Sequence, residues 1–344
     1  MSTRPLAAIL LAAGKGTRMR SSLPKVLHPV LGRPMLSYPL AATKDIGAHP
    51  RVVVVGYGAD QVAETFTQEE GIHFALQEEQ LGTGHAAAQA GPALDDFEGD
   101  VLILPGDVPL VSADIFRALL VHHRADQSVL TVLTTILDDP SSYGRIVRDK
   151  NNRLVRIVEA RDASAHELSI REINSGIYMA DASFLFSALS KLRNDNAQGE
   201  YYLTDIVAIA VDEGRPVGAS LHPQAADLWG VNNRVELARA ERRMSRRINE
   251  EWMTRGVGLA FPDTIWIEPG VVIGDDVYIE PHASLRGETR VGQRSWIGTG
   301  ARLRNVILGA GVEVKPYAIL EGGTIPVGRV IDEASVWRGG KRVK

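Results

Sequence analysis

The chain has 344 residues, with 38 Lys and Arg against 42 Asp and Glu, and a formal net charge of −4. This length favours two domains, because a domain commonly holds roughly 100–200 residues. The small net charge gives no electrostatic reason to expect nucleic acid or an anionic membrane as a partner. The absence of cysteine excludes disulfides, iron–sulfur clusters and thiolate metal sites. We expect a cytoplasmic protein.

The apolar octet from Leu6 to Ala13 fits either a buried strand or the core of an export signal. It runs directly into Gly14-Lys15-Gly16-Thr17-Arg18, without a cleavage-like stretch of small residues in between. A buried first strand is therefore the better interpretation. No apolar run approaches the roughly 20 residues that a membrane-spanning helix needs, so we expect no membrane association.

Short apolar runs alternate with helix-like segments over the first two-thirds of the chain. Leu6–Leu11, Arg51–Val55 and Val101–Leu104 are typical of strands buried on both faces of a mostly parallel sheet. Gln61–Glu69 and Thr83–Ala90 have helical patterning. This alternation predicts an α/β fold that binds ligands at the carboxyl ends of its strands.

A charged segment without Gly or Pro covers residues 234–254. Met244, Ile248 and Trp252 recur every four residues in it and form an apolar stripe on one helix face. We interpret this segment as a connecting helix over 233–255, between a first domain at 1–232 and a second at 256–344.

Beyond residue 260 an apolar residue recurs at every sixth position. These residues are Ile267, Ile273, Ile279, Leu285, Val291, Ile297 and Leu303 and, after a one-residue shift, Leu308, Val314 and Leu320. Small or β-branched residues follow most of them by four positions: Val277, Ala283, Thr289, Ser295, Ala301, Val312, Ala318 and Thr324. A six-residue period predicts a parallel β-helix in which each hexad forms one side of a coil.

A glycine-containing segment, Leu11–Met19, directly follows the expected first strand, and Pro24-Lys25 comes shortly after it. A dinucleotide-binding loop would have a third Gly near Met19 and an acidic residue at the end of the second strand, which instead ends Val55-Gly56. A Walker A loop would need Gly-Lys-Ser/Thr after a four-residue spacer, which is absent. The segment is therefore interpreted as a phosphate-binding loop of another type, with positive charge from Arg18 and Lys25.

This opening segment resembles that of the sugar nucleotidyltransferase family. Further matching segments follow in order: Leu76–Ala86, Gly106–Leu110, Tyr143–Arg145, Ile157–Glu159, Glu172–Ile177, Gln198–Asp205 and Gly230–Arg234. Over about residues 5–255 the chain resembles the uridylyltransferase half of the bifunctional bacterial enzyme that makes UDP-N-acetylglucosamine. The resemblance implies a Rossmann-like, mostly parallel mixed sheet (the nucleotide-diphospho-sugar transferase fold), followed by a short left-handed parallel β-helix.

The resemblance also implies roles for residues at matching positions. Those expected to bind the nucleotide are Leu11, Ala12, Ala13, Gly14, Gln77, Gly82, Thr83 and Gly106, with Gln77, Gly82 and Thr83 around the uracil. Those expected to bind the sugar are Gly144, Glu159, Asn174, Tyr202 and Thr204. Lys25, Arg18 and Asp107 are the expected catalytic residues, and Asp107 and Asn232 the expected Mg²⁺ ligands.

Several of these residues also have structural interpretations. Gly82 and Thr83 are suited to begin a helix, with Thr as its N-cap. Asp107 before Val-Pro fits a turn, and Asn174 fits a turn as well. Where the family often carries an aromatic residue, two positions before this Asp, the chain has Pro105.

The implied reaction joins UTP and N-acetylglucosamine 1-phosphate to give UDP-N-acetylglucosamine and pyrophosphate. The sugar phosphate is already anionic, so an in-line attack on the α-phosphorus needs no general base; positioning and charge stabilisation are the protein's task. Two alternatives remain: a nucleotidyltransferase for another sugar 1-phosphate or NTP, and a non-catalytic regulatory subunit of the same fold.

In the bifunctional family the β-helix also carries an acetyltransferase that uses acetyl-CoA. This chain has too few hexads for that domain, lacks its arginine motif and catalytic histidine segment, and has His282 as its only histidine after residue 222. We therefore expect no acetyltransferase activity, and a homo-oligomer, a trimer assembled through the β-helix.

Overall fold

A computed structural model describes residues 4–343, which form two compact units. The first contains the residues up to His28 together with Pro34–Glu236, and the second contains Pro29–Arg33 together with the residues from Leu237 onward. The segment expected to be a connecting helix is helical, as α8 (Arg234–Thr254), and most of it belongs to the second unit. Within residues 4–343, no helix has both the length and the apolar character that crossing a membrane requires.

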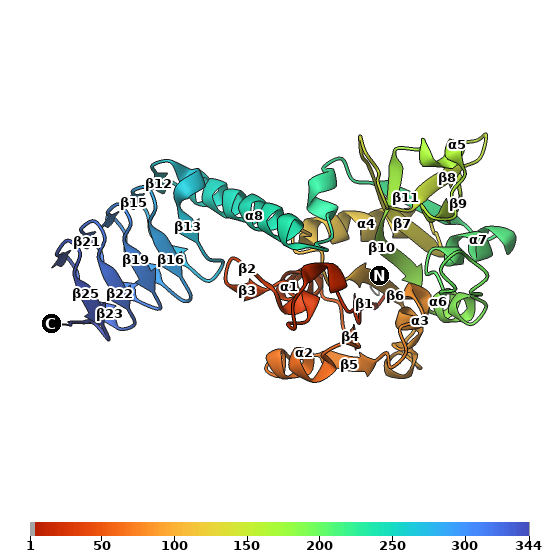
Figure 1. The fold of residues 1–344 in the computed structure, drawn as a ribbon, viewed down its shortest axis with the longest axis horizontal. Coiled ribbons are helices and arrows are strands. Elements are labelled where there is room, and N and C mark those ends of the chain that lie inside the picture. The colour runs from red at the N-terminus through yellow and green to blue at the C-terminus, as the bar shows by residue number, and fades with distance from the viewer. Residues whose placement is uncertain (1–3, 344) are drawn as a thin grey trace. The chain divides into compact units, whose positions relative to one another are not determined.

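The first unit is built on a mixed sheet whose main strands lie in the order β11-β7-β10-β6-β1-β4-β5 (Figure 1). Their bounds are β1 Leu6–Ala12, β4 Arg51–Val55, β5 Ile72–Leu76, β6 Asp100–Pro105, β7 Leu130–Ile136, β10 Glu172–Asp181 and β11 Val217–Leu221. Only β10 runs antiparallel to its neighbours in this series. The pair β8 (Arg145–Arg148) and β9 (Leu154–Val158) extends the sheet from β10.

Helices cover both faces of this sheet. One face carries α1 (Ser37–Asp45), α2 (Ala59–Thr65) and α4 (Ala113–Ala125). The other carries α3 (Thr83–Ala88), α6 (Ala182–Leu189) and α7 (Asp205–Asp212). Both faces of β1 are buried, with Ala8 and Leu10 in one apolar core and Ala7 and Ile9 in the other. This two-sided burial explains why the strand has a continuous apolar run instead of an alternating one.

The three strands predicted from apolar runs are confirmed as β1, β4 and β6. The helix predicted over Thr83–Ala90 is confirmed as α3 as far as Ala88, and residues 89–90 form a turn. The helix predicted over Gln61–Glu69 is confirmed only in its first part, as α2. Its continuation over 66–69 was wrong, because Phe66 is buried in the core at the end of α2 and the chain then turns through Gly71, at a φ of 71°, into β5.

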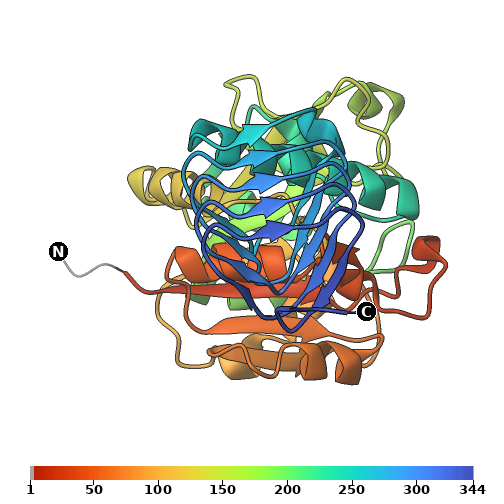
Figure 2. The same cartoon turned by 90° about the vertical axis from the view of Figure 1, so that its left-hand side faces the viewer.

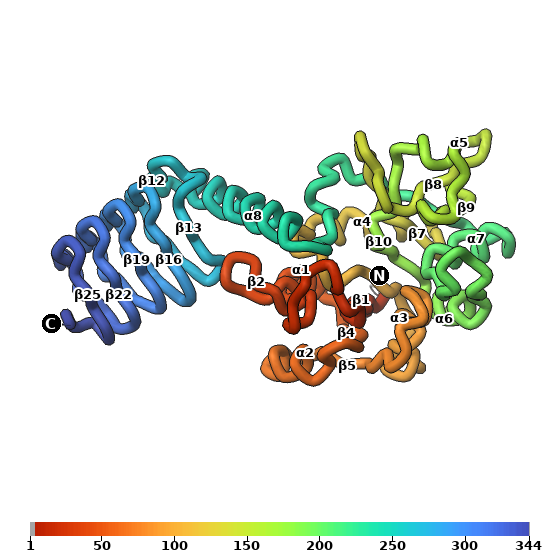
Figure 3. The backbone as a smooth tube through the Cα atoms, in the orientation of Figure 1, coloured from red at the N-terminus to blue at the C-terminus, as the bar shows by residue number. Residues whose placement is uncertain are grey.

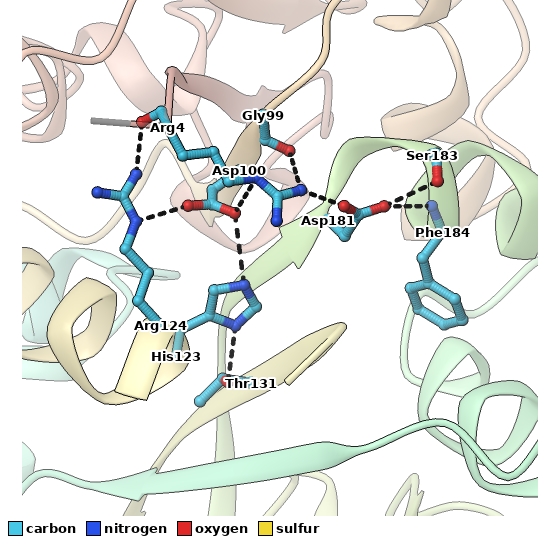
Figure 4. A network of polar contacts seen from close by, with 9 residues as sticks. All are labelled: Arg4, Gly99, Asp100, His123, Arg124, Thr131, Asp181, Ser183 and Phe184. Carbon is cyan, nitrogen blue, oxygen red and sulfur yellow. Dashed lines mark hydrogen bonds and ion pairs between the residues drawn. The ribbon is translucent and has the colours of Figure 1, made fainter. Parts of the chain in front are cut away.

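A buried polar network lies at the amino end of β6, at the opposite end of the strand from Pro105 (Figure 4). The carboxylate of Asp100 is 1% exposed, accepts a hydrogen bond of 2.8 Å from Arg124 Nε and lies 3.1 Å from Arg4 Nε. Burial alone would raise the pKa of Asp100, but hydrogen bonds from His123 and Arg124 and the charge of Arg4 outweigh burial and lower it. Asp100 is therefore ionised and ties the start of the chain to α4.

We expect Asp100→Asn to lower the free energy of unfolding of the first unit by about 2 kcal/mol at pH 7, the scale of hydrogen bonds to a charged group. A lowered pKa in the folded state stabilises above the ordinary value of 3.8, and this stabilisation is lost as the pH falls below it. The difference between variant and wild type should thus shrink from pH 5 to pH 3. Hydrogen exchange of β1 and β6 amides measures it, with Asp138→Asn, in an exposed ion pair, as the control. A difference that does not change with pH would contradict the prediction.

The second unit is a parallel β-helix with three sheets, as the hexad period predicts; Figure 2 looks along the stack of coils and Figure 3 traces the chain through them. The first sheet contains β12 Gly258–Leu259, β15 Tyr278–Ile279, β18 Trp296–Ile297, β21 Glu313–Val314 and β24 Val330–Ile331. The second contains β13 Trp266–Ile267, β16 Ser284–Arg286, β19 Arg302–Arg304, β22 Ile319–Glu321, β25 Val336–Arg338 and β26 Lys341–Arg342. The third contains β14 Val272–Ile273, β17 Arg290–Val291, β20 Ile307–Leu308 and β23 Thr324–Ile325.

All ten predicted apolar positions are buried in one core, which continues through Ile325, Ile331 and Trp337. The repeat therefore extends beyond Leu320, the last apolar position predicted from the sequence. A second one-residue shift separates Leu320 from Ile325 and breaks the hexad count. Thr324, expected among the small inward residues, is exposed because Ile325 takes the inward position in β23.

Three glycines, Gly274, Gly292 and Gly309, follow the stacked strands β14, β17 and β20. A Cβ on Gly292 would lie 2.5 Å from the carbonyl carbon of Gly309 in the next coil. A Cβ on Gly274 would lie 2.7 Å from the backbone N of Gln293, and one on Gly309 would lie 2.7 Å from that of Val327. At this corner, backbone packs directly on backbone, which leaves no space for a side chain.

We expect Gly292→Ala to destabilise the β-helix by roughly 1–3 kcal/mol, because the neighbouring coil cannot move away without losing its strand pairing. Thermal unfolding followed by tryptophan fluorescence measures the effect, since Trp266, Trp296 and Trp337 lie in this unit. Gly91→Ala, in the first unit, is the control, because a Cβ there would make only an ordinary contact with Phe186 at 3.7 Å. An unchanged melting temperature for Gly292→Ala would refute the packing argument.

The helix α8 packs on the start of the β-helix. Ile248 and Trp252 contact its apolar core and Met244 is buried, which confirms the predicted stripe. Asn249 is 1% exposed and donates to the carbonyls of Pro262 and Ile265 at 2.8 and 3.0 Å. The side-chain amide thus joins α8 to the first coil.

Candidate active site

The loop expected to bind phosphate follows β1. The chain passes from Ala12 through Gly14 and Gly16 into two short 3₁₀ turns, Thr17–Met19 and Lys25–Leu27. Gly16 has a φ of 59°, and a Cβ there would lie 2.7 Å from Lys25 Cβ. Gly14 has open space where its side chain would be. The loop can therefore fold closely around Lys25 while its backbone stays accessible at Gly14.

A cavity of about 390 Å³ opens at the carboxyl ends of β1 and β6. The predicted site residues that line it are Leu11, Ala12, Ala13, Gly14, Lys25, Gln77, Gly82, Thr83, Asp107, Glu159, Asn174 and Thr204. They come from segments spread over almost two hundred residues of sequence. The prediction that ligands bind at this edge of the sheet agrees with the position of the cavity.

Five predicted residues do not line this cavity. Arg18 lines a second cavity of about 490 Å³, and Glu159 lines both. Gly106 donates its N–H to the Leu11 carbonyl at 2.8 Å, and the Gly144 carbonyl accepts from Asn174 N at 2.9 Å, so both act through the backbone.

Tyr202 and Asn232 are the other two. The hydroxyl of Tyr202 meets Gln198 Nε2 at 2.8 Å and Asp162 at 3.3 Å, outside the lining of the first cavity. The side-chain oxygen of Asn232 accepts hydrogen bonds from Arg18 and Lys25.

Charged groups converge where the phosphate loop meets the loop after β6. The Lys25 ammonium forms an ion pair with Asp107 and lies 3.3 Å from the side-chain oxygen of Asn232. Arg18 Nη2 donates to that same oxygen at 3.0 Å. The backbone also joins this corner, because Val231 N donates to the Asp107 carbonyl at 2.9 Å. The Asp107 side chain is only 13% exposed, so its charge is paired within a partly dry site.

The donor set at this corner fits a magnesium ion. The oxygens of Asp107 and Asn232 already face one common cation, the Lys25 ammonium. Mg²⁺ prefers oxygen ligands and usually takes one or two from protein, with the remainder from phosphates and water. Within residues 4–343 there is no cluster of three or more His, Asp or Glu side chains placed to hold a metal by themselves.

One end of the cavity is formed by the turn before α3. Gly82 has a φ of 109°, and a Cβ there would lie 2.7 Å from the Tyr201 carbonyl oxygen, so only glycine fits. Thr83 does not cap the helix: Gly82 occupies the N-cap position, and the Thr83 hydroxyl accepts a hydrogen bond from Leu203 N at 3.1 Å. The predicted Thr N-cap was therefore wrong, because the hydroxyl joins α3 to the loop before α7.

The other end of the cavity contains Glu159, Asn174 and Thr204. Burial raises the pKa of the Glu159 carboxyl, and the charges of Asp162 and other nearby carboxylates raise it further, despite a 3.3 Å hydrogen bond from the Thr204 hydroxyl. Asn174 accepts from Gly176 N at 2.9 Å, as the turn interpretation predicts, and donates to the Tyr178 hydroxyl at 2.7 Å.

Several lining residues were not assigned a role from the sequence, including Gln80, Gly176, Tyr178 and Glu200. Gln80 lies inside a matching segment and donates to the Ala13 carbonyl at 2.8 Å, which fixes the phosphate loop. No local pattern marks Tyr178, since an aromatic residue in a strand is usually core. The one weak indication that Tyr178 belongs to the site is that it follows the predicted site residue Asn174 by four positions in the same strand.

Glu159→Gln should raise the melting temperature of the first unit by a few degrees at pH 8. A folded-state pKa above the ordinary 4.5 means that ionisation of Glu159 destabilises the fold; this effect is present above the raised pKa and absent below 4.5. The gain should therefore disappear when melting is measured near pH 4. A variant less stable than wild type at pH 8 would show that the carboxylate is held favourably, against this prediction.

A family model described as Nucleotidyl transferase matches residues 7–253. The chain belongs to this family. "Bifunctional protein GlmU" of Pelobacter propionicus is 48% identical over 316 residues, which are 92% of this chain and 69% of the relative. The protein of that name from Geobacter metallireducens is 49% identical over 305 residues, 88% of this chain and 64% of the relative.

The chain thus spans about two-thirds of the length of these relatives. These matches confirm the resemblance inferred from the sequence motifs. A solved structure of a putative glucose-1-phosphate thymidylyltransferase from Bacillus anthracis, in complex with a sucrose, has a TM-score of 0.57 at 22% identity and covers 69% of this chain and 94% of its own. That likeness concerns the fold.

Proposed function

We propose that this nucleotidyltransferase is a uridylyltransferase that forms UDP-N-acetylglucosamine and pyrophosphate from UTP and N-acetylglucosamine 1-phosphate. The observation that carries the proposal is the convergence of Asn232 on Lys25 and Asp107, two residues that line the cavity beside the loop after β1. The bifunctional relatives support the choice of substrates by their name, and this step from relative to chain is part of the proposal.

The residues divide into three groups along the cavity. Gln77 and Gly82 would hold the nucleobase at one end, and Glu159, Asn174 and Thr204 would hold the sugar hydroxyls and acetamido group at the other. Between them, Lys25 and accessible backbone N–H groups near Gly14 would bind the phosphates, with Arg18 beside them. Placing both substrates in line lets the sugar phosphate oxygen attack the α-phosphorus, while pyrophosphate leaves toward the cationic side chains.

Asp107 and Asn232 would hold Mg²⁺, which when bound neutralises charge on the phosphate oxygens. Lys25 has a second task in this arrangement. Its ammonium pairs with Asp107 and would also bind phosphate, which keeps the carboxylate and the substrate anions close together despite their like charge. No general base is required of the chain, because the attacking phosphate is already ionised near neutral pH.

The β-helix is proposed to serve assembly and not catalysis. We propose that it assembles the chain into a trimer and has no acetyltransferase activity, since it lacks the histidine-bearing segment of that site. Acetyl transfer from acetyl-CoA to glucosamine 1-phosphate by the purified chain would overturn the second statement, and a monomer by sedimentation equilibrium would overturn the first.

The experiment that tests the function is pyrophosphate release from each of the four NTPs with Mg²⁺ and a panel of sugar 1-phosphates. Release confined to UTP with N-acetylglucosamine 1-phosphate supports the proposal. Release with another pair would keep the chemistry and replace the substrates. No pyrophosphate release with any pair of substrates would favour a non-catalytic subunit of the same fold.

Asp107→Ala should lower turnover at least ~10²-fold, the scale of removing one preorganised electrostatic group. The chemical reason is that Lys25 loses the carboxylate that fixes it and the proposed metal loses a ligand. Asp114→Ala, at an exposed carboxylate on α4, is the matched control and should keep wild-type kinetics. Near-wild-type turnover in Asp107→Ala would refute the role of this residue.

A further inference from the structure

A chain of side-chain hydrogen bonds lies behind the nucleobase end of the cavity. Gln77 follows β5, while His85 and Gln89 lie on and at the end of α3. Gln77 Nε2 lies 3.0 Å from His85 Nδ1, and Gln89 Nε2 lies 3.1 Å from His85 Nε2. Only Gln77 lines the cavity, so His85 reaches any ligand through it.

The orientation of the Gln77 amide follows from its surroundings. Its Nε2 lies 3.1 Å from the Gly82 carbonyl oxygen, which is an acceptor and nothing else. The amide nitrogen must therefore face Gly82, because the reverse orientation would bring two oxygens together at a side chain that is only 4% exposed. Its second hydrogen points to His85 Nδ1. Among residues 4–343, no donor reaches the remaining oxygen, Gln77 Oε1.

These contacts also determine the proton position on His85. A neutral imidazole has one N–H, yet amide nitrogens are placed at both of its ring nitrogens. One amide must turn. Turning Gln77 would break its bond to Gly82 in a buried position. Turning Gln89 would break its 3.2 Å bond to the His85 carbonyl, but Gln89 is half-buried, so water can replace that bond. The proton therefore lies on Nε2, Gln89 presents its oxygen to it, and Nδ1 accepts from Gln77.

We propose that His85 is a positioning residue that holds the Gln77 amide so that Gln77 offers the nucleobase only a hydrogen-bond acceptor. This inference rests on the proposed function, in that a nucleobase occupies this end of the cavity. Uracil has a donor at N3, which Gln77 Oε1 can accept. Cytosine has a lone pair at N3, which would face the same oxygen without a proton between them. His85 thus contributes to the choice between the two pyrimidines without contacting either.

The residue type alone suggests that Gln77 offers a nucleobase both parts of its amide. A glutamine has both a donor and an acceptor, which suits the mixed edge of uracil. In this structure the donor is already used by Gly82 and His85, so selection depends on the acceptor alone. Without His85, one amide hydrogen would be free and only the bond to Gly82 would hold the amide, so the turned orientation that serves cytosine would cost less.

The test measures equilibrium binding of UTP and CTP to the full chain by isothermal titration calorimetry, without a sugar phosphate. His85→Phe and His85→Ala both remove the acceptor, one with the ring volume kept and one without. Each should lower the ratio of UTP to CTP affinity about tenfold, the effect of one ordinary hydrogen bond. His85→Asn, whose Oδ1 can take the place of Nδ1, should keep most of the ratio. Gln89→Ala is the control and should leave it unchanged.

A wild-type ratio in His85→Phe or in His85→Ala would overturn the proposal, as would a loss in His85→Asn as large as in the other two. With a sugar 1-phosphate present, His85→Phe and His85→Ala should raise KM for UTP. They should leave kcat at saturation unchanged, because His85 does not touch the reacting atoms. The wild type separates this inference from the proposed function. Wild type that binds neither UTP nor CTP overturns the function, whereas wild type that prefers UTP together with variants that share its preference overturns the role of His85 alone.

Discussion

The ion pair between Lys25 and Asp107 is the contact on which the organisation of the site depends. Lys25 belongs to the loop after β1, and Asp107 to the loop after β6, and these strands are parallel neighbours in the centre of the sheet. Adjacent parallel strands end at the same edge, so their loops meet there without further constraint. Asn232 reaches the same ammonium from a segment beyond β11. The sheet brings these three segments to one point, and the remaining cavity walls are built around it.

The two ends of β6 illustrate opposite uses of a buried carboxylate. At the amino end, three basic side chains surround Asp100 and lower its pKa, which makes burial compatible with stability. Near the carboxyl end, Glu159 is a half-buried residue, and desolvation and neighbouring acidic groups together raise its pKa. A fold selected for stability alone would not keep the second arrangement. Unfavourable charge environments of this kind are typical of residues retained for ligand binding. The well-paired Asp100 network at the other end of β6 stabilises the fold in which Glu159 is kept.

Much of this architecture follows from short patterns in the sequence. Two-sided burial makes β1, β4 and β6 visible as apolar runs, and the hexads make the β-helix visible, because each pattern repeats a local environment. The second shift, at Gly323, escaped detection because a single missing residue changes which side chain points inward from Thr324 to Ile325. The loop after β1 has a sequence motif that predicts phosphate binding, but the convergence of Asn232 on Lys25 and the orientation of Gln77 depend on contacts between distant segments, which no local pattern contains.

The corner glycines Gly274, Gly292 and Gly309 place one coil of the β-helix directly against the backbone of the next. Each coil is therefore specified by its two neighbours and by little else. In such a linear array, whole coils can be gained or lost in evolution while the surviving ones keep their register, provided that the ends remain covered. The length of this unit is a heritable variable that can change in steps, independently of the chemistry in the other unit.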